Sequence, residues 1–184
     1  MRVIGGSRKG HKLAAAPRKL LRPTSDRVRT VLFDILGNAV PRARVLDTFA
    51  GSGSLGIEAL SRGAGWADFV EKNRRLAATL ASNIKKTHLE DHGRVVVADA
   101  FLFLSRITDT QAEPYDLILA DPPYDFLKYE KFLEFAGQRS VLAEAGTIAL
   151  ETSARVSVDN EVGDLQVYLR RTVGETALLF YRRT

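Results

Sequence analysis

The residues Asp121-Pro122-Pro123-Tyr124 directly follow an apolar run, Tyr115 to Ala120, whose length and flanking residues predict a fully buried strand. Asp121 is therefore expected at the carboxyl end of this strand, where open α/β sheets bind their ligands. Two successive prolines fix the backbone and supply no N–H, so the corner presents carbonyl oxygens, a carboxylate and a phenol ring. These groups suit a flat ligand that donates hydrogen bonds. A rigid strand-to-helix turn is an equal interpretation of these four residues alone.

A glycine-rich turn follows an earlier predicted strand over 45–49 and precedes a predicted helix over 57–62. Gly51, Gly53 and Gly56 form the pattern Gly-x-Gly-x-x-Gly. The first two would let the backbone approach a ligand closely, and Gly56 would let the helix pack tightly on the strand. A tight turn without any ligand produces the same pattern, so this motif is weak by itself.

Asp47, Glu71 and Asp99 place carboxylates at the ends of three earlier predicted strands, and Asp121 adds a fourth. A helix cap explains any one of them but explains four in succession poorly, so we predict a nucleoside site at this edge of the sheet. Glu71 lies 24 residues after Asp47, where a carboxylate accepts hydrogen bonds from a ribose diol. Asp47 beside the glycine turn suits a ligand with ammonium and sulfonium groups better than a pyrophosphate.

From residue 44 onward the chain alternates between predicted strands and helices. Further strands are expected over 67–70, 94–98, 115–120 and 147–151, and further helices over 76–86, 101–107 and 128–136. Two β-rich runs, 166–172 and 176–181, are joined by too few residues for a helical crossover and must pair antiparallel. We therefore predict a single α/β domain over 1–184, with a mostly parallel seven-stranded sheet and an antiparallel last strand.

Positive charge is concentrated at the N-terminus. Residues 1–44 carry eleven Lys and Arg against two acidic residues, a local charge of +9, whereas the remainder carries sixteen against twenty, or −4. Short apolar pieces at 3–4 and 13–14 predict a small basic hairpin over 1–21, and a leading helix over 22–37 is expected to begin at Thr24 or Ser25. Nucleic acid is the first candidate partner, although a solvated basic tail has the same composition. The expected RNA-binding residues are Arg2, Arg8, Lys9, Lys12, Arg22, Arg27 and Arg29, the last two because they fall outside the apolar stripe of the leading helix.

The absence of cysteine excludes disulfides, thiolate zinc sites and a cysteine nucleophile. The three histidines, at 11, 88 and 92, have no convincing metal-ligand spacing, so no metal is expected. No apolar run reaches about 18 residues and the N-terminus has no apolar signal core, so we expect a cytoplasmic protein without membrane contact. We also expect a monomer.

These motifs together resemble the Rossmann-like class I S-adenosylmethionine-dependent methyltransferases. Asp47 to Gly53 is similar to their first motif, Glu71 to their ribose-binding acid and Asp99 to the residue near adenine, while Asp121 to Tyr124 is similar to the Asp-Pro-Pro-Tyr motif of enzymes that methylate exocyclic amino groups. The resemblance implies S-adenosyl-L-methionine as cofactor. The cofactor-binding residues are then expected to be Asp47, Phe49, Gly51, Ser52, Gly53, Glu71, Lys72, Asp99, Ala100 and Asp121.

A narrower resemblance covers nearly the whole chain. Residues 2–6, 9–13, 22–29, 49–63 and 121–124 are similar to the RsmD family of bacterial 16S rRNA guanine-N2 methyltransferases, with one departure at Asp34-Ile35, a helix position. This resemblance implies methylation of the N2 amino group of guanine 966 in 16S rRNA, within a 30S assembly particle. Asp121, Pro122 and Tyr124 would then be catalytic: the first two would accept hydrogen bonds from the amine, and Tyr124 would stack on the base.

Three other functions compete with this interpretation. A DNA adenine-N6 methyltransferase can share the Asp-Pro-Pro-Tyr corner, but 184 residues leave little room for a target-recognition domain. A protein glutamine methyltransferase would be expected to have Asn at position 121. A non-catalytic RNA-binding assembly factor on a methyltransferase scaffold is the alternative from another class.

Overall fold

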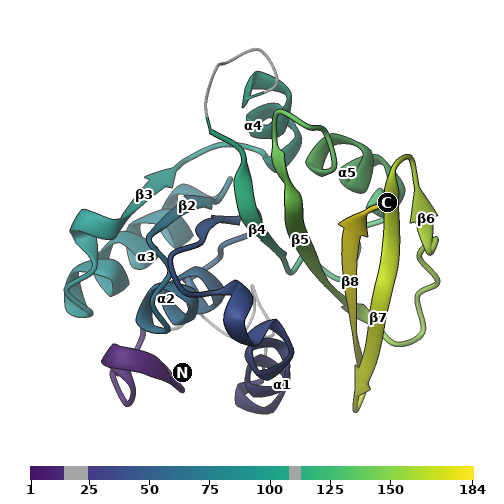
Figure 1. Cartoon of the computed structure of the whole chain (residues 1–184). Helices are drawn as coiled ribbons and strands as arrows, with labels where there is room; N and C mark the ends of the chain where they lie inside the picture. The colour runs from purple at the N-terminus through teal and green to yellow at the C-terminus, as the bar shows by residue number, and fades with distance from the viewer. Residues whose placement is uncertain (15–24, 108–112) are drawn as a thin grey trace.

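The computed structural model of the chain describes residues 1–14, 25–107 and 113–184 (Figure 1). In this part of the chain, eight strands form one sheet in the order β3-β2-β1-β4-β5-β8-β7-β6. The strands are β1 (Arg44–Asp47), β2 (Trp66–Val70), β3 (Gly93–Val96), β4 (Tyr115–Ala120), β5 (Leu142–Ser153), β6 (Glu161–Val162), β7 (Leu165–Val173) and β8 (Thr176–Arg183).

The first five strands are parallel to one another, whereas β8 pairs antiparallel with both β5 and β7. The predicted α/β fold, a mostly parallel sheet with an antiparallel last strand, is confirmed. The sheet has one strand more than the seven expected, because the two-residue β6 at its edge is too short to produce a pattern. The winding direction reverses between β1 and β4, which makes the carboxyl ends of these strands the ligand-binding crevice of such sheets.

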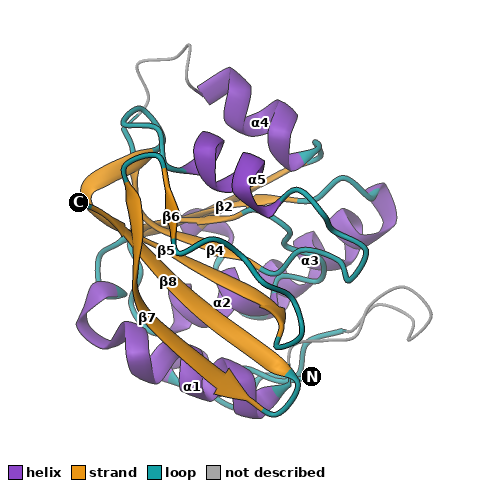
Figure 2. Cartoon of the chain, turned by 90° about the vertical axis from the view of Figure 1, so that its right-hand side faces the viewer, coloured by secondary structure: helices purple, strands orange, loops and turns teal. Residues whose placement is uncertain are grey.

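Helices cover both faces of the sheet (Figures 1 and 2). They are α1 (Asp26–Leu36), α2 (Ser54–Ser61), α3 (Arg74–Lys86), α4 (Ala100–Ile107) and α5 (Tyr129–Ala136), with 3₁₀ turns at Gly6–Arg8, Gly37–Ala39 and Glu90–His92. One apolar cluster joins α1, α2 and α3 to the sheet, and a second joins α4 and α5 to the opposite face. Along β4, Leu117 and Leu119 belong to the first cluster, and Ile118 and Ala120 to the second. The same alternation places the next residue, Asp121, toward the α1 face.

Helix α1 begins and ends where its capping residues predict. The Ser25 side chain accepts a hydrogen bond from the Val28 N–H (3.2 Å), and Gly37 ends the helix with φ +44°. Residues 15–24, which include the predicted RNA contact Arg22, lie outside the described part of the chain.

The described N-terminal segment, residues 1–14, pairs with itself as expected, but through one β-bridge between Arg2 and Lys12. Its Val3 and Leu13 side chains are buried in the cluster that contains α1 and α2. The segment is therefore packed into the domain and does not project from it. No helix in the described residues is long and apolar enough to cross a membrane.

Candidate active site

The four predicted carboxylates lie where parallel strands end, at one edge of the sheet that we call the carboxyl edge. Asp47 is the last residue of β1, Glu71 and Asp121 directly follow β2 and β4, and Asp99 lies between β3 and α4. Asp47 and Glu71 are buried, Asp121 is half-buried and Asp99 is exposed. The fold thus brings the four residues to one edge at different depths.

Asp47 is the deepest of these carboxylates, with 1% of its surface exposed. Its Oδ2 atom accepts a hydrogen bond from the Gly56 N–H (2.9 Å) in the first turn of α2. Burial raises the pKa of Asp47 to about 7, and the negative charges of Asp121 and Glu71 act in the same direction, while the Gly56 N–H opposes them. A cationic group close to Asp47 would therefore shift this carboxyl group to its ionised form near neutral pH.

Glu71 fixes the glycine turn to the end of β2. Its Oε2 atom accepts from the Gly51 N–H (2.9 Å) and its Oε1 atom from the Asn73 N–H (2.7 Å). A carboxylate oxygen can accept two hydrogen bonds, so each oxygen retains capacity for a further donor. The side chain is held in one orientation and can still bind hydroxyl groups.

The glycines of the turn are required by its geometry. Gly51 and Gly53 have φ angles of +55° and +89°, in the left-handed region that other residues rarely adopt. A Cβ atom on Gly53 would lie 2.2 Å from Leu80 Cδ1, and one on Gly56 would lie 2.3 Å from Phe69 Cε1. Gly56 has the packing role expected of it, and Gly53, expected to face a ligand, also allows the turn to pack on α3.

Asp99 is the case in which a helix cap does explain the carboxylate. Its Oδ1 atom accepts from the N–H groups of Phe101 (2.9 Å) and Leu102 (3.4 Å), at the start of α4. Asp99 also lines a hollow of about 710 Å³ at the carboxyl edge. This hollow is bounded by Lys72, Asp99, Phe101, Leu102, Ser105, Pro123, Asp125, Phe126, Leu127, Lys128, Lys131 and Phe135. We call it the aromatic hollow.

The remaining predicted cofactor residues lie around these groups. The Phe49 ring contacts that of Phe126, with 5.3 Å between ring centroids. The Ser52 carbonyl accepts from Asn83 Nδ2 (2.8 Å), and Ala100 is buried as the first residue of α4. In the described residues, no group of three or more His, Asp or Glu side chains is arranged to hold a metal ion.

A second, smaller cavity of about 220 Å³ lies beside the Asp-Pro-Pro-Tyr corner. We call it the corner cavity. Asp121, Pro122 and Tyr124 line it, and Tyr124 is 67% exposed. The other lining residues are Ser25, Arg27, Val28, Tyr129, Glu151, Thr152, Ser153 and the β7–β8 turn residues Val173, Gly174, Glu175 and Thr176.

Most of the residues that line this cavity were not predicted from the sequence. Glu151 could have been found, because it follows the same rule as the other acids: a carboxylate near the carboxyl end of a buried parallel strand. The β7–β8 turn carried no comparable signal. It reaches the cavity because the last hairpin lies beside α1, as both views show (Figures 1 and 2).

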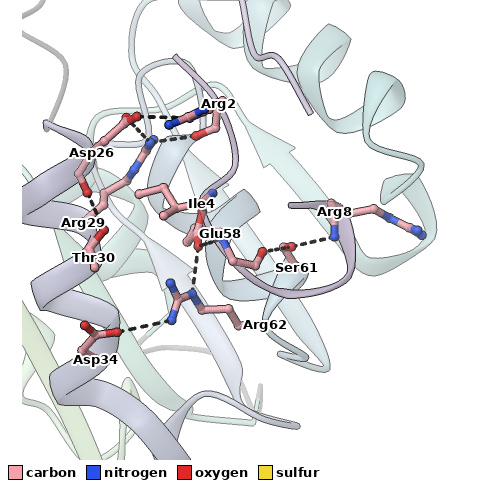
Figure 3. Close-up of polar contacts among 11 residues, drawn as sticks. Arg2, Ile4, Arg8, Asp26, Arg29, Thr30, Asp34, Glu58, Ser61 and Arg62 are labelled. Atoms are coloured by element: carbon pink, nitrogen blue, oxygen red, sulfur yellow. Dashed lines mark hydrogen bonds and ion pairs between the residues drawn. The ribbon is translucent and has the colours of Figure 1, made fainter. Parts of the chain in front are cut away.

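The N-terminal segment is fastened to α2 by a buried carboxylate (Figure 3). Glu58, 1% exposed, accepts from the N–H groups of Ile4 (2.7 Å) and Gly5 (2.8 Å) and from Arg62 Nε (2.8 Å). At the end of α2, the Ser61 hydroxyl donates to the Gly5 carbonyl (2.6 Å) and accepts from the Arg8 N–H (2.9 Å). Residues 4–8 are therefore held along the second half of α2.

The prediction that Arg29 is an exposed RNA contact is wrong. Its side chain was expected to face solvent or RNA, but it is 0% exposed. Its Nη2 atom donates to the Arg2 carbonyl and to Asp26 Oδ1, both at 2.8 Å (Figure 3). Burial lowers the pKa of Arg29, and the charges of Asp26 and Glu58 oppose that shift. The buried face of α1 is wider than the predicted stripe, and Arg29 uses it to join the N-terminal segment to the start of α1.

The other predicted phosphate contacts fall into two places. Arg27 is exposed at the corner cavity, and Arg2, ion-paired with Asp26 (3.6 Å), lies at the same end of α1. The exposed Lys12 is paired with Arg2 through the backbone. Arg8 and the exposed Lys9 lie beside the end of α2, where Arg8 also donates to the His88 carbonyl (3.3 Å).

Comparison with known proteins gives consistent matches over the whole chain. The family described as Conserved hypothetical protein 95 matches residues 1–182. The Bacillus subtilis protein YlbH is 37% identical over 183 residues, covering 100% of this chain and 99% of its own. Ribosomal RNA small subunit methyltransferase D of Escherichia coli is 32% identical, covering 100% and 90%. The solved structure of the Escherichia coli protein yhhF superposes with a TM-score of 0.86 at 32% identity, covering 100% and 97%.

Proposed function

The chain belongs to the RsmD family, and from this premise we propose that it methylates the exocyclic N2 amino group of a guanine in 16S rRNA, using S-adenosyl-L-methionine. The observation that carries the proposal is the corner cavity, where Asp121, Pro122 and Tyr124 meet beside the row of acidic strand ends. We take the target to be guanine 966, as in the family, presented by a 30S assembly particle to a monomeric, metal-free enzyme.

The residues at the carboxyl edge fit the chemistry of this cofactor. Glu71 is oriented to accept hydrogen bonds from ribose hydroxyls, and the aromatic hollow with Asp99 offers a flat site for adenine. An ammonium group near Asp47 would keep that carboxylate ionised, which favours an amino-acid moiety over a phosphate. Bound S-adenosyl-L-methionine would supply a methyl group on a positively charged sulfur. The structure of the turn at 51–56 would orient it toward the corner cavity.

The corner cavity suits a single base. Its volume of about 220 Å³ is below the roughly 300–1,000 Å³ of pockets for larger ligands. A base in a folded RNA reaches such a site only after it is unstacked. The exposed Tyr124 ring can stack on it, which contributes about 1–3 kcal/mol per base in comparable contacts.

Asp121 and Pro122 would then prepare the amine. Hydrogen bonds from its N–H groups to the Asp121 carboxylate and the Pro122 carbonyl orient the nitrogen lone pair toward the methyl group. They also stabilise the positive charge that develops on nitrogen during transfer. The proton that the nitrogen loses passes to Asp121 or to water next to it. Arg2, Lys12 and Arg27 contact phosphates around the entrance and contribute affinity without reading the base.

The test is methylation of 30S particles and of free 16S rRNA that lack the modification, followed by nucleoside mass spectrometry. The proposal expects N2-methylguanosine at one position, with particles as the better substrate. N6-methyladenine formed on DNA would support the DNA methyltransferase instead. Particle binding without any methyl transfer would support the non-catalytic assembly factor.

A further inference from the structure

Glu151 brings a second carboxylate to the corner cavity. In the register of β4 with β5, Ala120 is opposite Leu150, so the next residues, Asp121 and Glu151, are lateral neighbours. Adjacent strands are about 4.8 Å apart. Both residues line the corner cavity, and Glu151 is half-buried in its wall.

The two side chains also point to the same face of the sheet. Ala149 belongs to the apolar cluster of α1, α2 and α3, and Leu150 belongs to the opposite cluster. Because side chains alternate along a strand, Glu151 is directed toward α1, as is Asp121 beyond Leu119 of β4. The charge of Glu151 acts on the buried Arg29 of α1, whose pKa it raises against the effect of burial. The ionised carboxylate of a Glu side chain only accepts hydrogen bonds.

Two neighbouring acceptors define the base that fits between them. Guanine carries two adjacent donors on its pairing edge, the N1–H and the N2 amino group. Adenine and cytosine each place an unprotonated ring nitrogen beside their amino group, which would face a carboxylate without a proton between them. We propose that Glu151 is a specificity-determining residue that accepts the guanine N1–H, while Asp121 accepts from the N2 amine.

This inference rests on the proposed function, and it can fail separately. The probe is 16S rRNA with 2-aminopurine in place of the target guanine, introduced by ligation of a synthetic segment and assembled into particles. 2-Aminopurine keeps the amine that is methylated but has an unprotonated N1. The measurement is kcat/KM on guanine particles divided by kcat/KM on 2-aminopurine particles.

The wild-type protein should prefer guanine by roughly 10- to 100-fold, because a half-buried carboxylate facing an unprotonated nitrogen loses its hydrogen bond. In Glu151→Gln, the amide can accept from the guanine N1–H or donate to the 2-aminopurine N1. The preference should therefore fall to within about threefold. Glu144→Gln is the matched control, since Glu144 is exposed near the start of the same strand, and its preference should equal that of the wild type.

A Glu151→Gln variant that keeps the wild-type preference, even with lower activity on both substrates, would show that Glu151 does not select the base and would overturn the inference. A wild-type protein that accepts both bases equally would overturn it without any variant, so the test does not depend on the variant folding. Absence of N2-methylguanosine on guanine particles would overturn the proposed function, and the inference with it.

Discussion

Two parts of the carboxyl edge are built in different ways. The half that we propose binds the cofactor, called the cofactor half, consists of Asp47, the turn 51–56, Glu71 and Asp99. Each of its three acids accepts a hydrogen bond from a backbone N–H group that lies at most nine residues away in the sequence. The half that we propose binds the substrate, called the substrate half, consists of residues 25–28, 121–124, Glu151 and the turn 173–176, which come from four separate parts of the chain. The first half is organised mainly by local sequence, and the second depends on how distant elements pack.

The largest expected effect is that of Asp121→Ala, which should lower methyl transfer without weakening cofactor binding. Asp121→Ala removes the proposed acceptor for the amine, and loss of one such stabilising contact typically lowers the rate by about 10²–10³-fold. Methyl transfer in a single turnover should fall by this amount, while calorimetric affinity for S-adenosyl-L-methionine changes by less than about threefold. Undiminished methylation with intact cofactor binding would show that Asp121 has no role in the chemistry.

Asp47 should make stability depend on pH in the cofactor half. Its pKa is about 3.9 in an unfolded chain and about 7 in the folded protein, so the folded state binds more protons between these values. The contribution of Asp47 to the free energy of unfolding therefore falls as pH rises from about 4 to 7, by on the order of a few kcal/mol. Urea unfolding of the cofactor-free protein at pH 5 and pH 8 measures it.

Asp47→Asn is the reference for that experiment, because the amide does not titrate. The difference in unfolding free energy between wild type and variant should shrink or change sign in favour of the variant as pH rises. Parallel curves for the two proteins would mean that the Asp47 pKa is not raised by burial.

Glu58→Gln should disturb the substrate half through the N-terminal segment. An amide cannot accept from Ile4, Gly5 and Arg62 together, and buried donors left without a partner cost about 1–3 kcal/mol. Hydrogen exchange should accelerate in residues 1–14, and RNA affinity should fall while cofactor affinity is kept. Asp34→Asn is the control, since it weakens only an exposed contact to Arg62 at 3.9 Å. Equal effects of the two variants would show that Glu58 is not what fastens the segment.

The smallest effect concerns the phosphate contacts. Arg27→Ala and Lys12→Ala should each reduce the slope of log affinity against log salt concentration by about 1, with the same loss on all RNA sequences. Arg139→Ala, an exposed arginine between α5 and β5, should leave the slope unchanged. Equal slopes for wild type and all three variants would show that Arg27 and Lys12 do not contact RNA phosphates.

The same contrast explains what the sequence could predict. The alternation of strands and helices, the antiparallel hairpin and the position of all four acids followed from local patterns such as the run 115–120. Asp99 shows that an acid at a strand end does not by itself identify a ligand site, because a cap on α4 and a ligand-binding role have the same local pattern. β6 was missed because two residues have no periodicity.

Errors concentrated where distant segments meet. Arg29 was placed outside because its position on the helix was judged only from the apolar stripe, and its partners are a backbone carbonyl 27 residues away and a neighbouring Asp. Val3 and Leu13 were predicted only as parts of a small hairpin, but they complete a core built by residues far along the chain. The β7–β8 turn joins the corner cavity only through the packing of the last hairpin on α1.

The fastening of Ile4 and Gly5 to Glu58 also sets an order of events during synthesis. The first fourteen residues leave the ribosome early, but their partners on α2 and at Asn83 of α3 are made 53 to 69 residues later. The corner cavity also needs the β7–β8 turn, which emerges after all of these partners. Because Glu58 emerges before Glu71, we expect nascent chains to protect Ile4 and Gly5 before the Gly51 N–H gains its Glu71 contact. Pulse-labelled hydrogen exchange on stalled chains, with Gly51 protected before Ile4, would contradict this order.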